Sequence, residues 1–519
     1  MLYVAKTLCL VLAALQGGDA LVVGAPRAQP TQTVFRGSTP MMAAMPLTKV
    51  VATVGPASEE FETLQKCLAA GMSVMRCNFS HATKDEFFLR TGNLRKAKGG
   101  ERINLMLDTK GPEIRMGGLK ICKETGNRKA KIEMVKGEMI VLSNDPALDG
   151  ASDNKNLYVG YDKLTEKLVP GTKVLLDDGL ISLVVKKKVD DKSVECEIIN
   201  TSEIGERKGV NLPGIKTGLP ALSTQDRADI AFGIQNDIDC IAASFVRSAE
   251  GVELIREYVM ECHNKYCPDP KNTPPPMIIS KVETTEALEN LQEIVDASDG
   301  VMVARGDLGV EVDIWEVTTW QKEMVRMCVE AGKPVIVATQ MLESMQKNPR
   351  PTRAEVSDVT NAVLELADAV MLSGESANGL YPDGSIGMQS SIITHAEQWA
   401  REQDQYPLYC VEPDALGSMY AVAQSAAVLA ESSEAAAIVV MENGWGDLAR
   451  AVSACRPDMP IVPISPSMKV CRQLIVNRGV YPIKGPVEDP VQAARDAGYA
   501  AAGEPVVLLD SDGKLSVVS

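Results

Sequence analysis

Short runs of apolar residues alternate with helix-like segments over most of the chain. Eight runs have the length and β-branched content of buried strands, and each ends in polar or glycine-rich sequence. Between most of them, apolar residues recur every three or four positions, which is typical of amphipathic helices. This alternation predicts an α/β fold, a (β/α)8 TIM barrel of parallel strands. The predicted strands cover residues 49–58, 73–81, 103–115, 239–248, 277–283, 300–307, 334–340 and 368–376.

One interval between the predicted strands is much longer than the others. Between Arg115 and Asp239 the sequence is rich in β-type runs punctuated by Gly, Asn and Asp. We therefore expect a small β-barrel-like domain, about residues 116–213, inserted after the third strand of a barrel that spans 47–115 and 214–391. A loop that follows a barrel strand lies at the mouth where active sites form, so this domain is a candidate lid. The alternative is a decorative insertion, since loop length costs little.

The pattern changes after about residue 392. Ala-rich helical segments alternate there with the short apolar runs AAAIVVME, PIVPIS and EPVVLLDS. This predicts a separate, open α/β domain over residues 392–519.

The first 46 residues are typical of a targeting leader. Residues 1–20 combine one basic residue, Lys6, with the apolar run TLCLVLAAL and small residues, which is the shape of a signal peptide. Residues 21–46 contain Arg27 and Arg36 and no acidic residue, as transit peptides do. Together they predict a bipartite leader that directs the protein to a plastid. The alternatives are a secretory signal, or a misassigned start codon on a cytoplasmic protein.

Composition excludes several classes of protein. A hydrophobic content of 45% and a charged content of 24% are those of a soluble globular chain, and 519 residues suggest roughly two to four domains. The net charge of −16 argues against a nucleic-acid surface. No segment after the leader is apolar enough to span a membrane. The 12 cysteines include no CxxC pair, so neither a zinc ribbon nor a disulfide framework is indicated.

The segment CHNKYCPDPKNTPPP, residues 262–276, is predicted to be a surface loop before the fifth strand. Its two cysteines, Cys262 and Cys267, are either a redox-sensitive pair or two unremarkable thiols, and the second reading is the common one.

The stretch from Met277 to Glu311 carries the strongest chemical signal. Lys281 and Glu283 are two residues apart at the end of one predicted strand, so they face the same side. Asp307, at the end of the next strand, would lie beside Glu283. Two carboxylates next to an ammonium form a plausible Mg²⁺ site with an electrophilic lysine over it. The alternative is a surface ion pair that closes a strand.

Charged and hydroxyl side chains follow several other predicted strands. Cations that hold phosphate and carboxylates that hold Mg²⁺ are what phosphoryl transfer needs, because its catalysis is mainly positioning and neutralisation. The residues at these strand ends are Arg76, Asn78, Ser80, His81, Asp108, Thr109, Lys110, Glu113, Arg115, Lys281, Glu283, Gly306, Asp307, Thr339, Gln340, Ser373 and Glu375.

From about residue 47 onward the chain resembles the pyruvate kinase family. The motifs NFSH, DTKGPEIR, KGVNLPG, ISKVET, VARGDLGVE, ATQMLESM and PTRAE occur in this order around a barrel interrupted after its third strand. The resemblance implies transfer of the phosphoryl group of phosphoenolpyruvate to ADP, giving ATP and pyruvate in glycolysis. It also implies a homotetramer.

The resemblance assigns metal and substrate roles. Mg²⁺ (or Mn²⁺) would be held by Glu283 and Asp307, and Lys281 would neutralise the phosphoryl group while Arg76 binds the phosphate. The substrate carboxylate would be seated by Gly306, Asp307 and Thr339. Thr339 and Ser373 are candidates for a hydroxyl–water relay that protonates enolpyruvate, and His81 is a possible general acid with a nucleotide-contacting or structural role as its alternative.

The resemblance also assigns a potassium site and a nucleotide site. K⁺ would be held by Asn78, Ser80, Asp108 and Thr109. Glu113 matches the potassium-requiring members, whereas a lysine there marks those that do without K⁺. The nucleotide would contact Asn78, Phe79, Ser80, His81, Arg115 and Lys208, the last delivered from the lid.

One loop departs from the family's pattern. In members activated by fructose 1,6-bisphosphate, a loop of the C-terminal domain is rich in Thr, Ser, Lys and Gly, which bind phosphate. Here that loop reads MENGWGD, residues 441–447, and contributes Glu442 and Asp447. We therefore predict that fructose 1,6-bisphosphate does not activate this chain through that loop.

Two rival functions share parts of this sequence pattern. A metal-dependent aldolase or lyase would also place Glu and Asp around Mg²⁺, but it would not need Lys281, Arg115, a potassium site or a lid. A catalytically inactive scaffold protein would be expected to have lost ligands, and none is missing from the barrel positions.

Overall fold

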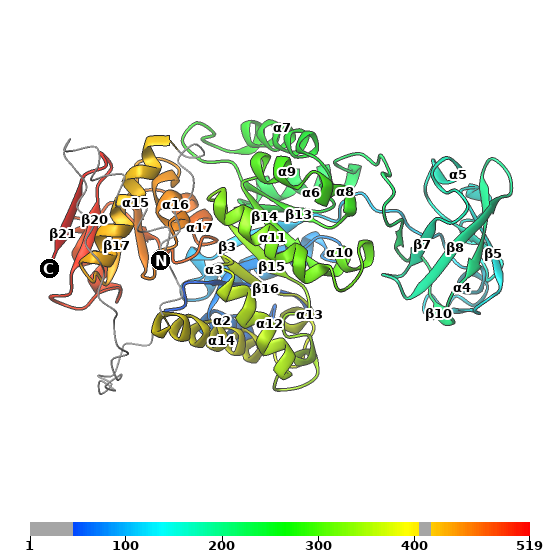
Figure 1. Ribbon diagram of the computed structural model, residues 1–519, viewed down its shortest axis with the longest axis horizontal. Coiled ribbons are helices and arrows are strands. Elements are labelled where there is room, and N and C mark those ends of the chain that lie inside the picture. The colour runs from blue at the N-terminus through cyan, green and yellow to red at the C-terminus, as the bar shows by residue number, and fades with distance from the viewer. Residues whose placement is uncertain (1–44, 404–416) are drawn as a thin grey trace, which may run out of the picture. The chain divides into compact units, whose positions relative to one another are not determined.

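Eight parallel strands close into a barrel in the computed structural model, which describes residues 45–403 and 417–519 (Figure 1). The order around the barrel is β1-β16-β15-β14-β13-β12-β3-β2, so each predicted strand is present and pairs with its expected neighbours. The predicted barrel is confirmed. The strands are β1 (Lys49–Thr53), β2 (Met72–Asn78), β3 (Asn104–Asp108), β12 (Cys240–Ala243), β13 (Met277–Val282), β14 (Gly300–Ala304), β15 (Val335–Ala338) and β16 (Ala369–Leu372).

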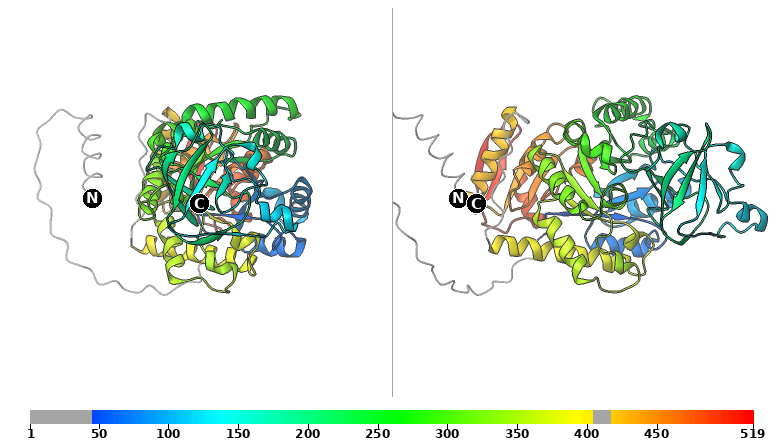
Figure 2. Two further views of the ribbon diagram at one scale, coloured as in Figure 1. Left: turned by 90° about the vertical axis from the view of Figure 1, so that its right-hand side faces the viewer. Right: turned by 45° about the vertical axis from the view of Figure 1, so that its right-hand side comes forward.

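Helices surround the barrel (Figure 2). Several of them begin at caps encoded in the sequence. Thr83, Ser223 and Thr352 each start a helix with a reciprocal capping box that satisfies free backbone N–H groups. The helices are α2 (Phe61–Ala69), α3 (Lys84–Lys96), α6 (Thr224–Gln235), α7 (Ala249–Tyr266), α8 (Thr285–Glu289), α9 (Leu291–Ala297), α10 (Arg305–Glu311), α11 (Val317–Glu330), α12 (Arg353–Leu364), α13 (Gly374–Ala377) and α14 (Pro382–Glu402).

The inserted segment forms a β domain with its own core. Its main sheet has six strands in the order β11-β7-β8-β9-β5-β6, and a separate two-stranded sheet pairs β10 with β4. The arrangement expected to be barrel-like is therefore an open sheet with a two-stranded companion. Its elements are α4 (Lys120–Thr125), β4 (Ile132–Met134), β5 (Met139–Ser143), β6 (Asn156–Tyr158), α5 (Leu164–Lys167), β7 (Lys173–Leu176), β8 (Ile181–Lys188), β9 (Ser193–Ile198), β10 (Ser202–Ile204) and β11 (Val210–Asn211).

The C-terminal part is an α/β domain, as predicted. Its sheet has the order β19-β18-β17-β20-β21, with only β21 antiparallel. The expected boundary at residue 392 falls inside α14, which packs against α2 and α12 of the barrel. The elements are α15 (Gly417–Ser432), β17 (Ala437–Met441), α16 (Asp447–Ala454), β18 (Ile461–Ser465), α17 (Met468–Leu474), β19 (Ile483–Lys484), α18 (Pro490–Asp496), β20 (Val506–Leu509) and β21 (Leu515–Val518).

The chain joins the fold at Pro46. The hydroxyl of Tyr481 donates to the Pro46 carbonyl, and the backbone N–H groups of Leu47 and Thr48 donate to the buried Glu397 at 2.8 Å each. Residues 1–44 of the predicted leader lie outside the described residues. A protein that keeps these anchors must therefore begin no later than Met45.

A search of the described residues for membrane spans found no helix long and apolar enough to cross a bilayer.

Candidate active site

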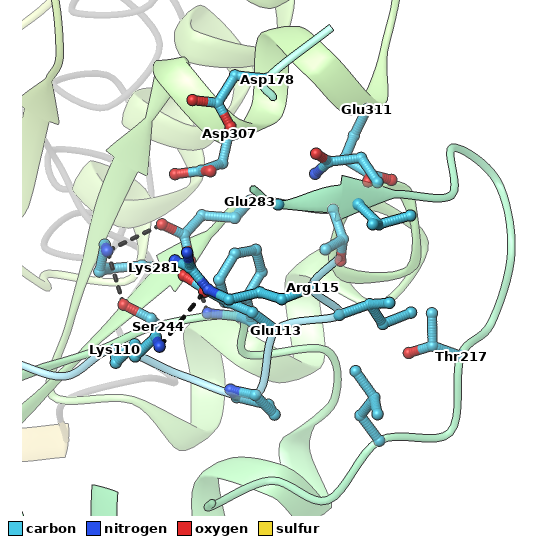
Figure 3. Close-up of a pocket in the computed structure, with 18 of the residues that line it drawn as sticks. Lys110, Glu113, Arg115, Asp178, Thr217, Ser244, Lys281, Glu283, Asp307 and Glu311 are labelled. Carbon is cyan, nitrogen blue, oxygen red and sulfur yellow. Dashed lines mark hydrogen bonds and ion pairs between the residues drawn. The ribbon is translucent and has the colours of Figure 1, made fainter. Parts of the chain in front are cut away.

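A cavity of about 390 Å³ opens at the carboxyl ends of the barrel strands (Figure 3). Its walls come from both the barrel and the inserted domain. Most of the predicted site residues line it. These are Arg76, Asn78, Ser80, His81, Asp108, Lys110, Glu113, Arg115, Lys208, Lys281, Glu283 and Asp307.

Lys281 is the centre of a buried charge cluster. Its Nζ lies 2.9 Å from Glu283 Oε1 and 3.2 Å from Asp108 Oδ1, and it donates to Ser244 Oγ at 2.7 Å. Burial alone would lower the pKa of Lys281, but the charges of Asp108 and Glu283 raise it above its ordinary value. Lys281 therefore keeps its positive charge although its side chain is only 11% exposed.

Glu283 presents one carboxylate oxygen that is incompletely satisfied. Its Oε2 accepts a 2.6 Å hydrogen bond from the Phe245 N–H. Its Oε1 is buried and lies 2.9 Å from Lys281 Nζ, but that contact lacks hydrogen-bond geometry and leaves the oxygen without a hydrogen-bond partner. A buried oxygen in this state is a suitable ligand for a cation.

Asp307 shares this environment with Glu283. Burial and then the negative charge of Glu283 raise the pKa of Asp307 to about 7, and Asp178 of the inserted domain adds to the rise. Figure 3 shows Asp178, Asp307 and Glu283 on the same side of the cavity. A divalent cation would relieve the repulsion between these carboxylates. The pair therefore fits the predicted Mg²⁺ site.

Two details of the predicted metal site differ from expectation. Strand β14 ends at Ala304, so Asp307 lies in the first turn of helix α10 and not on a strand. Within residues 45–403 and 417–519, no group of three or more His, Cys, Asp and Glu side chains is placed to hold a metal ion. A cation at Glu283 and Asp307 would thus take further oxygen ligands from substrate or water.

The residues predicted to hold K⁺ come together at the ends of β2 and β3. Asn78 lies opposite Asp108 in the register of these strands, and its Oδ1 accepts from the Ser80 N–H at 3.0 Å. Asp108 also receives Arg76 Nε at 2.7 Å. Burial would raise the pKa of Asp108, but Arg76 and Lys281 lower it, so the carboxylate stays ionised. Thr109 accepts a 3.1 Å hydrogen bond from the Ser244 N–H through its hydroxyl.

Arg115 and Lys208 lie where the barrel meets the inserted domain. Arg115 pairs with Glu113 at 2.5 Å and donates to the Arg207 carbonyl at 2.9 Å. Lys208 pairs with Asp177 at 3.0 Å. Both cations are about two-fifths exposed, so they remain available to a phosphate.

Thr339, Gly306, Ser373, Thr109 and Phe79 are not among the residues that line the cavity. Thr339 and Gly306 are adjacent, because a Cβ built on Gly306 would lie 2.9 Å from Thr339 Cγ2. Ser373 donates its backbone N–H to Glu375 at 2.8 Å.

Phe79, predicted to contact the nucleotide, places its ring in the core. Its ring packs with Phe87 and Phe232 at centroid distances of 5.7 and 6.1 Å, and the residue is 8% exposed. The apolar ring belongs to the core, and a nucleotide contact by Phe79 stays a prediction. Its neighbours Asn78 and Ser80 face the cavity instead.

Several residues of the cavity were not predicted from the sequence. Ser244 bridges Lys281 and the Thr109 carbonyl, which accepts from Ser244 Oγ at 2.7 Å. Ser244 directly follows strand β12, and this position at a strand end could have identified it. The predicted strand extended to residue 248 and hid that end. Asp177 and Asp178 have φ values of 52° and 55°, as the left-handed turn encoded by Asp-Asp-Gly requires.

Glu311 is a further unpredicted residue of the cavity, and it gives a pH prediction. Burial raises its pKa from 4.5 to about 7, opposed by a hydrogen bond from Asn211. Between these values the folded chain keeps a proton that the unfolded chain releases, so stability falls as pH rises. Glu311→Gln should therefore raise the free energy of unfolding by up to about 3 kcal/mol at pH 8 and by less than about 1 kcal/mol near pH 5. Urea unfolding at both pH values measures this.

The matched control for this prediction is Glu316→Gln, which replaces an exposed glutamate. It should change stability at neither pH. An equal gain for Glu311→Gln at pH 5 and pH 8 would show that the effect does not come from the carboxylate charge.

The fold and cavity are those of a barrel enzyme with its site at the carboxyl ends of the strands. Two family models match the chain: "Pyruvate kinase, barrel domain" over residues 45–386 and "Pyruvate kinase, alpha/beta domain" over residues 420–515.

Individual proteins agree with the family models. Pyruvate kinase 1 of Trypanosoma brucei brucei is 37% identical over 480 residues, which cover 89% of this chain and 92% of the relative. A pyruvate kinase of Staphylococcus haemolyticus is 40% identical over 474 residues, or 89% of this chain and 77% of the relative. The crystal structure of a pyruvate kinase from Cryptosporidium parvum superposes with a TM-score of 0.81 and 33% identity, covering 91% and 96% of the two chains. The chain belongs to the pyruvate kinase family, whose members are phosphotransferases.

Proposed function

We propose that the chain transfers the phosphoryl group of phosphoenolpyruvate to ADP, yielding pyruvate and ATP. The observation that carries the proposal is Lys281, a buried and charged ammonium held between Asp108 and Glu283 at the cavity. A fixed positive charge in a site of low dielectric stabilises a phosphoryl group during transfer more strongly than it would in water.

Each of the proposed residues has a task in this reaction. Glu283 and Asp307 would hold Mg²⁺ (or Mn²⁺), which when bound supplies positive charge to the phosphate and carboxylate oxygens of the substrates. Arg76, fixed by Asp108 and by Thr53 at 2.7 Å each, binds the transferred phosphate.

After transfer, enolpyruvate must gain a proton. Thr339 and Ser373 are proposed to guide it through their hydroxyls and a water molecule, and Gly306 with Thr339 seats the substrate carboxylate. The exposed imidazole of His81 is proposed for nucleotide contact, together with Asn78, Ser80, Arg115 and Lys208.

We also propose that the enzyme requires K⁺. Glu113 supports this, because it lies at the cavity between Arg115 and Lys110, at 2.5 and 3.9 Å. Glu113→Lys should make turnover less dependent on K⁺, since a second ammonium supplies the monovalent charge. Replacing K⁺ by tetramethylammonium should lower the turnover of the unmodified enzyme at least about tenfold, a loss of roughly 1.4 kcal/mol in transition-state binding. The turnover of Glu113→Lys should fall less.

The charge control for this test is Glu289→Lys, an exposed residue paired with Lys216. It should keep the full K⁺ requirement. Equal dependence on K⁺ in the unmodified enzyme and Glu113→Lys would contradict the assignment.

The C-terminal loop supports the expectation that fructose 1,6-bisphosphate is not an activator. Glu442 is 4% exposed and accepts a 2.6 Å hydrogen bond from the Ala449 N–H in the first turn of α16. The chain's own carboxylate therefore occupies backbone donors that would otherwise attract a phosphate. A saturating titration should leave the half-saturating concentration of phosphoenolpyruvate unchanged, and a severalfold decrease would overturn the prediction.

Two further proposals concern assembly and location. A homotetramer is supported by Ile314 and Trp315, which follow α10 and are 70% and 73% exposed, and its mass in solution can be measured directly. Plastid targeting rests on the leader composition, with a cytoplasmic location as the alternative. Imaging a fluorescent fusion of residues 1–46 decides between them.

The proposed reaction is separated from its rivals by one assay. The protein should begin at Met45, because residues 45–519 form one compact unit. Pyruvate should form from phosphoenolpyruvate only when ADP and a divalent cation are both present. Pyruvate and inorganic phosphate formed without ADP would indicate a phosphatase, and no product with any nucleoside diphosphate would indicate a lyase or a scaffold protein.

A further inference from the structure

Arg305, the first residue of α10, uses its guanidinium group to join three parts of the barrel mouth. Its Nε donates to the Ala338 carbonyl at 3.0 Å and its Nη2 to the Thr339 carbonyl at 2.6 Å. Asp358 of α12 receives both terminal nitrogens, at 2.6 and 2.7 Å, and Gln321 of α11 accepts from Nη1 at 3.0 Å. The side chain is 13% exposed, so this network is largely shielded from water.

The carbonyls that Arg305 binds belong to a strained turn. Thr339 has φ of +75° and Gln340 has φ of +56°. A β-branched residue is rarely found in this left-handed region, and such a conformation persists only where its surroundings enforce it. Two hydrogen bonds from one rigid group, to the carbonyl before Thr339 and to that of Thr339 itself, enforce it here.

The same helix turn places a metal-site residue beside this strained threonine. Arg305, Gly306 and Asp307 are consecutive, and Gly306 leaves room for the Thr339 methyl group, which a Cβ would meet at 2.9 Å. Arg305 therefore fixes the position of Thr339 relative to Asp307. Asp358, through its bidentate pair, fixes Arg305 itself.

We infer that Arg305 is a positioning residue for the reaction, which holds Thr339 in its left-handed conformation next to the Glu283–Asp307 pair. The inference rests on the role proposed above for Thr339. Arg305 would not touch substrate, because its guanidinium donors already bind Ala338, Thr339 and other protein acceptors. Lysine cannot replace it, since one ammonium cannot match the planar fork that spans two carbonyls and a carboxylate.

The test compares Arg305→Lys with a matched arginine at the other end of the barrel. Arg256 of α7 also binds a backbone carbonyl, that of Ala297 at 2.7 Å, and an aspartate, Asp299 at 3.1 Å. Both partners directly precede strand β14, at its amino end. Arg305→Lys should lower kcat by roughly 100-fold, the cost of misplacing a reacting group by about 1 Å, while KM for phosphoenolpyruvate changes much less. Arg256→Lys should keep kcat within about threefold, since a partly exposed ion pair contributes little.

Two further measurements separate positioning from a general loss of structure. In Arg305→Ala, added guanidinium chloride at millimolar concentration should restore part of kcat, whereas ammonium chloride should not. In the double variant Arg305→Lys with Thr339→Val, the loss should be no larger than the greater single loss, because both changes disturb one unit. Losses that multiply would overturn the inference.

The outcomes also distinguish this inference from the proposed role of Thr339. Full activity in Thr339→Val would refute that role. A large loss in Thr339→Val with kcat near the unmodified value in Arg305→Lys would refute the positioning role alone. If Arg305→Lys does not fold, Asp358→Asn replaces it, since this variant keeps the arginine and weakens its anchor; an unchanged kcat in folded Asp358→Asn would likewise overturn the inference.

Discussion

Replacing Lys281 with methionine is expected to lower kcat by roughly 10³-fold, as the loss of a preorganised charge at a reacting centre does. The ammonium lies within 3.2 Å of Asp108, Glu283 and Ser244, and methionine supplies no charge to these contacts. Arg76 keeps its own bonds to Asp108 and Thr53 in the variant. Phosphoenolpyruvate should therefore still bind while transfer fails.

Equilibrium binding and turnover, measured on the same sample, test this prediction. Methionine has a similar length and no charge, which limits the change in packing. Lys216→Met, at an exposed ion pair with Glu289, is the control and should leave kcat unchanged. A Lys281→Met variant with kcat within tenfold of the unmodified enzyme would remove Lys281 from the reaction.

Glu283→Gln is expected to weaken divalent-cation binding at least about tenfold, a loss of roughly 1.4 kcal/mol, and to lower turnover with it. In the unmodified protein the Phe245 N–H donates to Glu283 at 2.6 Å, and glutamine keeps an oxygen that can accept this hydrogen bond. The substitution removes the negative charge. Asp307 alone would then face the cation, and a single carboxylate is a weaker site for Mg²⁺ than two.

Mn²⁺ titration followed by electron paramagnetic resonance measures the cation without requiring turnover. Glu286→Gln is the matched control, since Glu286 also lines the cavity and pairs with Arg247 at 3.8 Å. Its Mn²⁺ affinity should equal that of the unmodified enzyme. Unchanged affinity in Glu283→Gln would place the cation elsewhere.

The barrel was predictable because parallel strands buried on both faces are encoded as apolar runs. Residues 277–282 and 300–304 are wholly buried, and each is such a run in the sequence. The pairing of Lys281 with Glu283 was equally accessible, since residues two apart on a strand face the same side. Both signals are local in the sequence.

Features that depend on contacts between distant segments were not predictable. Ser244 contributes because β12 lies beside both β13 and β3, which a single strand sequence does not reveal. The bonds of Arg305 to the Ala338 and Thr339 carbonyls depend on how β15 ends. The packing of the Phe79 ring with Phe232 likewise depends on a distant helix.

The most direct test of the account follows the phosphorus atom itself. Phosphorus NMR of the protein beginning at Met45, with phosphoenolpyruvate, ADP, Mg²⁺ and K⁺, reports where the phosphoryl group goes. We expect the γ-phosphate signal of ATP to replace the phosphoenolpyruvate signal, without inorganic phosphate. Lys281→Met should show no such change on the same time scale. Inorganic phosphate in place of ATP, or an unchanged phosphoenolpyruvate signal with the unmodified protein, would contradict it.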